Sequence, residues 1–264
     1  TVAGTINTTN TQMDIGAVTL AAATTLDTGN AAAGILNVGA VTSGTNALTL
    51  DSGSTGGATI GLTSFADATG GLTIRDAGGL ATIGAVGSGT AGNVTITNSQ
   101  AGVTFSSTVD AGTLLLTDTT GTVTVQGNLA ATTLTTANAA YNVQFDEDVT
   151  ITNDTSFVNT GTVALGSAND DVLLFGGGIN TAGAGTNPSG TTLSGILRTS
   201  ADQVDLGGVT LGANSVIDTT NNGGSAGGAA INVASVDADN AGSNDRTLTL
   251  NSGTGGAIAV SGAI

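Results

Sequence analysis

The sequence has no cysteine, histidine, lysine or tryptophan, and each absence narrows what the chain can do. The common nucleophile–base pairs of enzymes need histidine, cysteine or lysine, so those mechanisms are excluded. A Lys–Asn isopeptide crosslink is excluded as well. Without cysteine the chain is compatible with an oxidising exterior but gives no sign of one.

Basic residues are almost as scarce. Arg75, Arg198 and Arg246 stand against 19 acidic residues, and the net charge is −16. Nucleic acids and anionic membranes are bound through clustered lysine and arginine, so we expect neither as a partner. No apolar run approaches the roughly 18 residues of a membrane span, so we expect no membrane insertion.

Proline occurs once and aromatic residues make up 2% of the chain, whereas 43 residues are glycine. The glycines have no period of three, which excludes collagen. Hydrophobic residues make up 39% and charged residues 8%, which is not the composition of a disordered chain. A core with so few rings must be filled by Val, Ile, Leu and Ala, which suits a narrow interior between closely spaced backbones.

Short runs in which an aliphatic residue alternates with threonine are the dominant local pattern. Period-two alternation predicts strands with one buried and one wet face. Clusters of Gly, Asn, Asp and Ser separate the runs and predict turns. The clearest runs are Gly4–Thr8, Asn46–Leu50, Gly71–Arg75, Asn93–Thr97, Gly121–Val125, Asp148–Thr152 and Arg246–Leu250.

Strong strand runs recur about every 20 to 25 residues, the usual coil size of a parallel β-helix. We therefore predict an all-β fold, a parallel β-helix or β-solenoid with coils of about 20 residues. A sandwich or a barrel would also contain many short strands, but neither accounts as well for the lack of rings and charges.

A much longer repeat is visible as self-similarity. Residues 2–29 align without gaps to residues 193–220, and eleven positions are identical. The alignment resumes at Asn37–Val38 with Asn232–Val233, and again at Leu48–Gly53 with Leu248–Gly253. We therefore expect residues 1–190 to form one large solenoid module and residues 191–264 to begin the next copy. We also expect the native protein to continue on both sides.

Stretches such as Val109–Val125 and Phe157–Gly166 resemble the giant β-strand-repeat surface proteins of bacteria, which are similar to filamentous haemagglutinin-type exoproteins and autotransporter passengers. The resemblance extends over the whole chain and concerns its composition and style of repeat. It does not include a catalytic motif. It implies a right-handed β-helix that is secreted to the cell surface. It also implies a role in adhesion, biofilm or a protective fibre.

The leading hypothesis is a structural segment of an extracellular fibre or adhesin, a stiff repetitive rod without enzymatic activity. Its partners would be neighbouring repeats or copies of the same protein, and surface or matrix polysaccharide. The alternative is a carbohydrate-binding or polysaccharide-cleaving β-helix, which a groove lined by acidic and aromatic residues would favour. Lateral assembly into a sheath is a third possibility.

Pairs of carboxylates are the one remaining route to catalysis, because they can hydrolyse glycosidic bonds. The candidates are Asp146, Glu147, Asp148, Asp170 and Asp171. Acidic clusters without arginine or aromatic sugar platforms are usually solvated corners. We therefore assign no catalytic residue.

A calcium site near Asn169, Asp170 and Asp171 is a weak alternative, because this Gly- and Asp-rich segment is similar to a calcium nonapeptide. The segment is not repeated nine residues on, so a corner turn with Asx hydrogen bonds is favoured. Asp237, Asp239 and Asp245 are scattered. No metal or cofactor site is predicted.

Thr-x-Thr pairs such as Thr122–Thr124 and Thr133–Thr135 occur on ice-binding solenoids, but their irregular spacing favours an ordinary wet face. The five phenylalanines are expected to stack in the core, and the single tyrosine, Tyr141, to lie at a corner or an interface. The phenylalanines are Phe65, Phe105, Phe145, Phe157 and Phe175.

Overall fold

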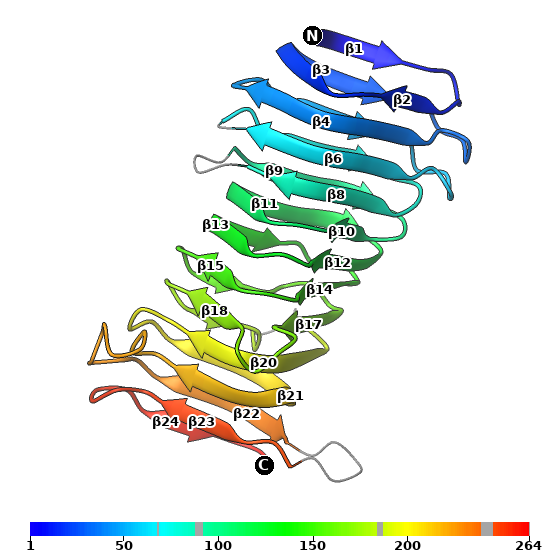
Figure 1. The fold of residues 1–264 in the computed structure, drawn as a ribbon. Helices are drawn as coiled ribbons and strands as arrows, with labels where there is room; N and C mark the ends of the chain where they lie inside the picture. Colours follow the sequence, from blue (N-terminus) through cyan, green and yellow to red (C-terminus); the bar gives the residue numbers. More distant parts are fainter. Residues whose placement is uncertain (68, 88–91, 184–186, 239–244, 264) are drawn as a thin grey trace. The chain divides into compact units, whose positions relative to one another are not determined.

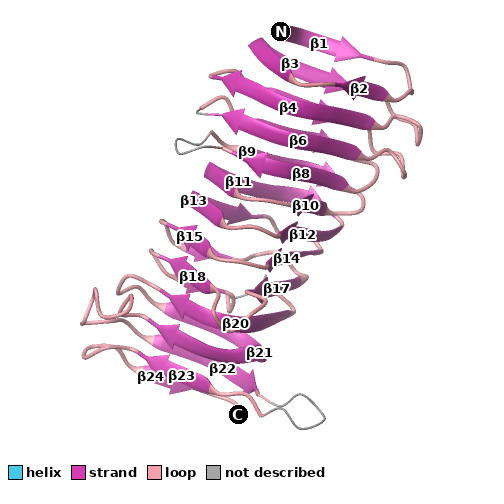
Figure 2. Ribbon diagram, in the orientation of Figure 1, coloured by secondary structure: helices cyan, strands magenta, loops and turns pink. Residues whose placement is uncertain are grey.

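The computed structural model describes residues 1–67, 69–87, 92–183, 187–238 and 245–263. These residues form strands and loops and contain no helix (Figure 2). Accordingly, the described part of the chain has no helix that could span a membrane. The predicted all-β class is confirmed, and so is the predicted architecture, because parallel strands stack as a β-solenoid.

The chain divides into two compact units. Unit 1 comprises residues 1–131 and 139–141, and unit 2 comprises residues 132–138 and 142–264. The strands of unit 1 are β1 (Val2–Asn7), β2 (Met13–Ile15), β3 (Val18–Asp27), β4 (Leu36–Gly44), β5 (Leu48–Asp51), β6 (Ile60–Asp67), β7 (Leu72–Asp76), β8 (Ala81–Val86), β9 (Val94–Ser99), β10 (Val103–Phe105), β11 (Val109–Thr119) and β12 (Gly121–Val125).

Three parallel ladders run through unit 1. Ladder 1 joins β2, β4, β6, β8, β10 and β12, which lie side by side in Figure 1. Ladder 2 joins the start of β3 to the later parts of β4, β6 and β8 and to the start of β11. Ladder 3 joins β1, β3, β5, β7, β9 and β11. Each turn therefore contributes three short strand segments.

Unit 2 follows the same plan, and β13 (Leu129–Thr136) and β14 (Tyr141–Phe145) run across the boundary between the units. Its ladders join β14–β17–β20–β21–β22, β15–β18–β20–β21–β23 and β16–β19–β21–β22–β24. The remaining strands are β15 (Val149–Ile151), β16 (Thr155–Ser156), β17 (Thr162–Leu165), β18 (Val172–Phe175), β19 (Ile179–Asn180), β20 (Gly190–Arg198), β21 (Val204–Asp218), β22 (Ile231–Asp237), β23 (Leu248–Asn251) and β24 (Ile258–Val260).

The turns vary in length more than the sequence pattern indicated. Most paired residues lie 20 to 24 positions apart, as in Ile6–Leu26 and Leu26–Leu50. The spacing rises to 28 between Thr162 and Gly190, and to 33 between Ser215 and Leu248. The strand registers are kept across these longer spacings, and the average turn is about 22 residues.

Aliphatic residues at alternate strand positions fill the interior of the turns, as the period-two pattern requires. Stacked columns such as Leu26, Leu50 and Ile74 are fully buried. The five phenylalanines are also buried, which confirms the prediction of core stacking. In unit 2, Phe157 packs edge to face between Phe145 and Phe175, with ring centroids 6.5 and 6.3 Å away.

Tyr141, which was expected at a corner or an interface, begins β14 directly after the bend at residues 138–140, and its side chain is buried in the core. Its ring is 1% exposed, and its hydroxyl donates a hydrogen bond to the carbonyl of Leu116 at 3.1 Å. A buried tyrosine needs a partner for its hydroxyl, and here the partner lies 25 residues earlier in the chain.

A recurring corner joins strand to loop. An Asp or Asn at the strand end is followed by a buried hydroxyl that donates to a carbonyl of the loop beyond. The Asx side chain accepts an N–H two residues on, as Asp27 does from Gly29 at 2.8 Å. The hydroxyls are Thr28, Ser52, Ser99, Thr219 and Ser252.

Thr219 carries the most complete of these corner bonds. Its buried hydroxyl donates to the carbonyl of Ala229 at 3.0 Å and accepts from the N–H of Ala229 at 2.9 Å. We expect Thr219→Val to lower the free energy of unfolding by about 1–3 kcal/mol, because both Ala229 groups lose this partner. Thr219→Ser, which keeps the hydroxyl, should cost under about 1 kcal/mol. Chemical denaturation followed by circular dichroism measures both; equal losses would contradict the hydrogen-bond explanation.

The segments that align in the long repeat have the same local geometry. Val2, Gly4 and Ile6 pair with Leu20, Thr24 and Leu26, and a bulge lies between Val2 and Gly4. In the second segment Leu193, Gly195 and Leu197 pair with Leu211, Ser215 and Ile217, and the bulge recurs between Leu193 and Gly195. Gly4 and Gly195 both have positive φ, of 74° and 89°. The two aligned segments thus have the same strand register, the same bulge and the same corner.

Candidate functional site

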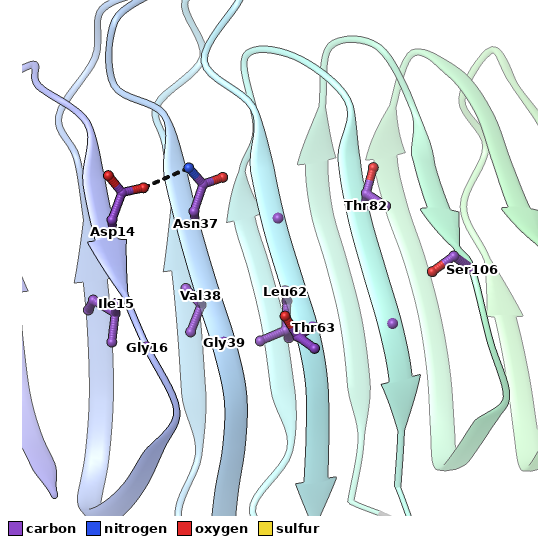
Figure 3. Close-up of a pocket in the computed structure, with 12 residues that line it drawn as sticks. Asp14, Ile15, Gly16, Asn37, Val38, Gly39, Leu62, Thr63, Thr82 and Ser106 are labelled. Carbon is purple, nitrogen blue, oxygen red and sulfur yellow. Dashed lines mark hydrogen bonds between the residues drawn. The ribbon is translucent and has the colours of Figure 1, made fainter.

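An open groove of about 610 Å³ follows ladder 1 of unit 1 across successive turns (Figure 3). Backbone forms part of its floor, because Gly16, Gly39 and Gly84 in the lining carry no side chain. A Cβ at Gly39 would lie 2.7 Å from the backbone of Gly16, and a Cβ at Gly84 would lie 1.9 Å from the carbonyl oxygen of Thr63. The turns approach so closely there that these two positions require glycine.

A carboxylate and two amides form a cluster at the first end of the groove. Asn37 donates to Asp14 Oδ1 at 2.8 Å, and Gln12 donates to both carboxylate oxygens at 2.9 and 2.8 Å. Figure 3 shows the Asp14 and Asn37 side chains directed toward each other from neighbouring turns. The hydrogen bonds from Asn37 and Gln12 hold the pKa of Asp14 below its usual value.

Unit 2 contains the same cluster at the aligned positions. Gln203 donates to the two oxygens of Asp205 at 2.8 and 2.7 Å, and Asn232 donates to Asp205 Oδ1 at 2.7 Å. The strand pairing Asp205–Asn232 matches the pairing Asp14–Asn37. The sequence alignment contained all three identities, but nothing in the sequence indicated that their side chains meet.

Among the acidic residues considered for glycoside hydrolysis, Asp146 and Asp148 accept local hydrogen bonds. Asp146 accepts from Gln144 at 2.6 Å, and Asp148 accepts from the N–H of Val172 at 2.7 Å. Glu147 and Asp170 are exposed. These bonds describe solvated corners, and the structure places none of these carboxylates in the groove along ladder 1.

The segment considered for calcium forms a turn that the side chain of Asp171 closes by hydrogen bonds to the preceding backbone. The buried Asp171 carboxylate accepts from the N–H groups of Ser167 and Ala168 at 2.7 and 2.9 Å, whereas Asn169 and Asp170 are exposed. Within the described ranges, no three acidic side chains gather in a way that could hold a metal ion. Asp237 and Asp245 belong to those ranges, and Asp239 lies outside them.

The three arginines serve separate local contacts. Arg75 forms an ion pair with Asp51 and lies 3.4 Å from Asp27. Arg246 donates to the carbonyl of Leu211. Arg198 is paired in register with Asp218, and its charge acts on that carboxylate.

Asp218 is the buried carboxylate most tightly held by its loop. Burial by itself raises the pKa of Asp218. This effect is outweighed by hydrogen bonds from the side chain and N–H of Thr220 and from the N–H of Asn222, and by the charge of Arg198, all of which lower the pKa. The net pKa lies below the usual value, so the contribution to stability is present above about pH 4. It is lost as the pH falls through the folded-state pKa.

We therefore expect the amide signals of Thr220 and Asn222 to titrate together in NMR spectra, with a midpoint below the ordinary value for aspartate of about 3.9. Asp218→Asn removes the titrating group, so those signals should stay flat over the same range. A midpoint at or above the ordinary value would contradict the arrangement.

Threonines form a regular column on ladder 3, contrary to the irregular spacing that the sequence indicated. Thr5, Thr25, Thr49, Thr73 and Thr95 are consecutive partners in register. The next outward column consists mainly of Asp and Asn rather than threonine, for example Asp27 and Asp51. A paired Thr-x-Thr array is therefore not formed by these strands.

Comparison with protein-family models, curated proteins and solved structures gave no match to this chain.

Proposed function

We propose that this chain is a structural segment of a bacterial extracellular fibre or adhesin, and that it acts on the cell surface as a stiff repetitive rod. The observation that carries the proposal is the repeated local geometry: two segments about 191 residues apart have the same strand register, bulge and corner. A sequence that specifies the same coil geometry twice is suited to extension by tandem addition.

The energetics of stacked coils support a mechanical role. Each inner turn pairs its backbone groups with the turn before and the turn after, and its aliphatic residues pack between them. Pulling one turn away would break several parallel hydrogen bonds and expose buried columns such as Leu26, Leu50 and Ile74. The cell-surface location and the adhesive role are supported by the resemblance to β-strand-repeat surface proteins.

The proposal is tested by lengthening the chain and measuring the dimensions of the particle. Because Val260 pairs with Val233 as Leu62 pairs with Val38, replacing residues 261–264 by a copy of residues 63–255 extends the chain in register. At about 4.8 Å per turn and about 22 residues per turn, the particle should lengthen by roughly 40 Å at constant width. Electron microscopy and small-angle X-ray scattering measure both dimensions. A longer chain that becomes wider or globular would refute the rod.

A further inference from the structure

We propose that the groove along ladder 1 is a binding site for a linear, uncharged glycan, with the Asp14–Asn37 pair as its polar anchor. The proposal concerns one surface of unit 1 and does not depend on the rod function. It requires the groove to fit such a ligand in length, chemistry and charge, and each of these follows from described residues.

The groove has the length of an oligosaccharide. Its lining comes from five successive turns, from Asp14 and Asn37 at one end, through Thr63 and Thr82, to Ser106. At about 4.8 Å per turn, five turns present a surface about 20 Å long, enough for several linked sugar rings. The glycine floor keeps it open, so a chain can lie along it without being enclosed.

The lining suits a ligand rich in hydroxyl groups. Asn37, Thr63, Thr82 and Ser106 supply side chains that both donate and accept hydrogen bonds. The Asp14 carboxylate is acceptor-only, and a sugar hydroxyl can donate to a carboxylate in a strong, charge-assisted bond. A peptide would need pockets for apolar side chains, whereas Val38 and Leu62 in the lining are already buried in the core.

Charge selects against an anionic polymer. Asp14 is the one ionisable residue in the lining, and the chain as a whole carries −16. The low pKa of Asp14 keeps this negative charge in place through the mildly acidic range. A polyuronate would be repelled, so a neutral glycan is the favoured class.

The internal repeat provides an independent argument. Of the identities shared by the two segments, Val18 and Leu20 lie on strand β3, Gly4 forms the bulge and Asp27 forms the corner. Gln12 and Asp14 are exposed and outside that corner, yet their hydrogen bonds recur at Gln203 and Asp205. Because the same three hydrogen-bonded side chains recur, the exposed cluster is a reproducible feature of this coil and provides a preformed polar anchor where it adjoins the groove.

The test is calorimetric titration of the 264-residue protein with cellohexaose, xylohexaose and mannohexaose, and with hexagalacturonate as the anionic probe. We expect at least one neutral hexaose to bind and the anionic one to bind at least tenfold more weakly. Binding of none of the neutral probes at millimolar concentration overturns the proposal, as does a preference for hexagalacturonate.

Variants then locate the site. Asp14→Ala with Asn37→Ala should weaken binding at least tenfold, and Thr82→Met, two turns beyond Asn37, should weaken it without touching the cluster. The matched control is Asp205→Ala with Asn232→Ala, which makes the same change in unit 2 and should leave the affinity for the groove unchanged. Circular dichroism melting shows that each variant is folded. Unchanged affinity in the first double variant, or a loss confined to the control, overturns the assignment.

Discussion

Gly84→Ala is expected to lower the free energy of unfolding by about 3 kcal/mol, at the upper end of what overpacking usually costs. The added Cβ would lie 1.9 Å from the carbonyl oxygen of Thr63 and 2.8 Å from its carbonyl carbon. Both atoms are backbone, so relief requires one turn to move away from the next and weakens the ladder hydrogen bonds between β6 and β8.

Gly16→Ala is the matched control, because Gly16 follows Ile15 at the same ladder position at which Gly84 follows Ile83. No atom lies within 4 Å of the Cβ that this substitution would add. The change should be within about 0.5 kcal/mol. Denaturant melts followed by circular dichroism give both values, and similar losses for the two variants would show that the close approach between turns is not the cause.

Phe157→Ala is expected to cost about 3–5 kcal/mol. The ring is 1% exposed and packs between Phe145 and Phe175, so its removal leaves a cavity lined by two aromatic edges. Because the contacts of a solenoid are made between neighbouring turns, the loss should be concentrated in unit 2.

Hydrogen exchange resolved by peptide is the suitable measurement, since a repeat array need not unfold in a single step. Amides of β14, β16 and β18 should lose protection while those of β4 and β6 keep it. Phe157→Leu, which refills part of the cavity, should lose under about half as much. A loss of protection spread evenly over both units would contradict the local explanation.

The class and architecture of the fold were predictable because they depend on local periodicity. Alternation of Thr with Val, Ile or Leu identifies strands, and the recurrence of those strands identifies coils. Turn length was underestimated because corner insertions, such as the one between Ser215 and Leu248, leave no mark on the strand pattern. The threonine column of ladder 3 was also not predicted, because the spacing between its paired residues varies between 20 and 24 positions.

The groove and its cluster were not predictable for a different reason. Asp14 and Asn37 are 23 residues apart, and only the pairing of β2 with β4 brings their side chains together. The burial of Tyr141 was not predictable for the same reason, since its partner Leu116 belongs to an earlier turn. By contrast, a corner turn at Asp171 was expected from the sequence, and its hydrogen bonds are local, with partners three and four residues earlier.

In the unequal turns, the length of the corner loops varies independently of the strand pairing. Strand pairing is maintained whether the paired residues are 18 positions apart, as Val2 and Leu20 are, or 33, as Ser215 and Leu248 are. Loop closure becomes only slowly less favourable with length, so a corner can lengthen at little cost in free energy. A population of such chains can therefore diversify what it displays to its surroundings while its axial spacing stays fixed, which allows surface variation to proceed without loss of the scaffold.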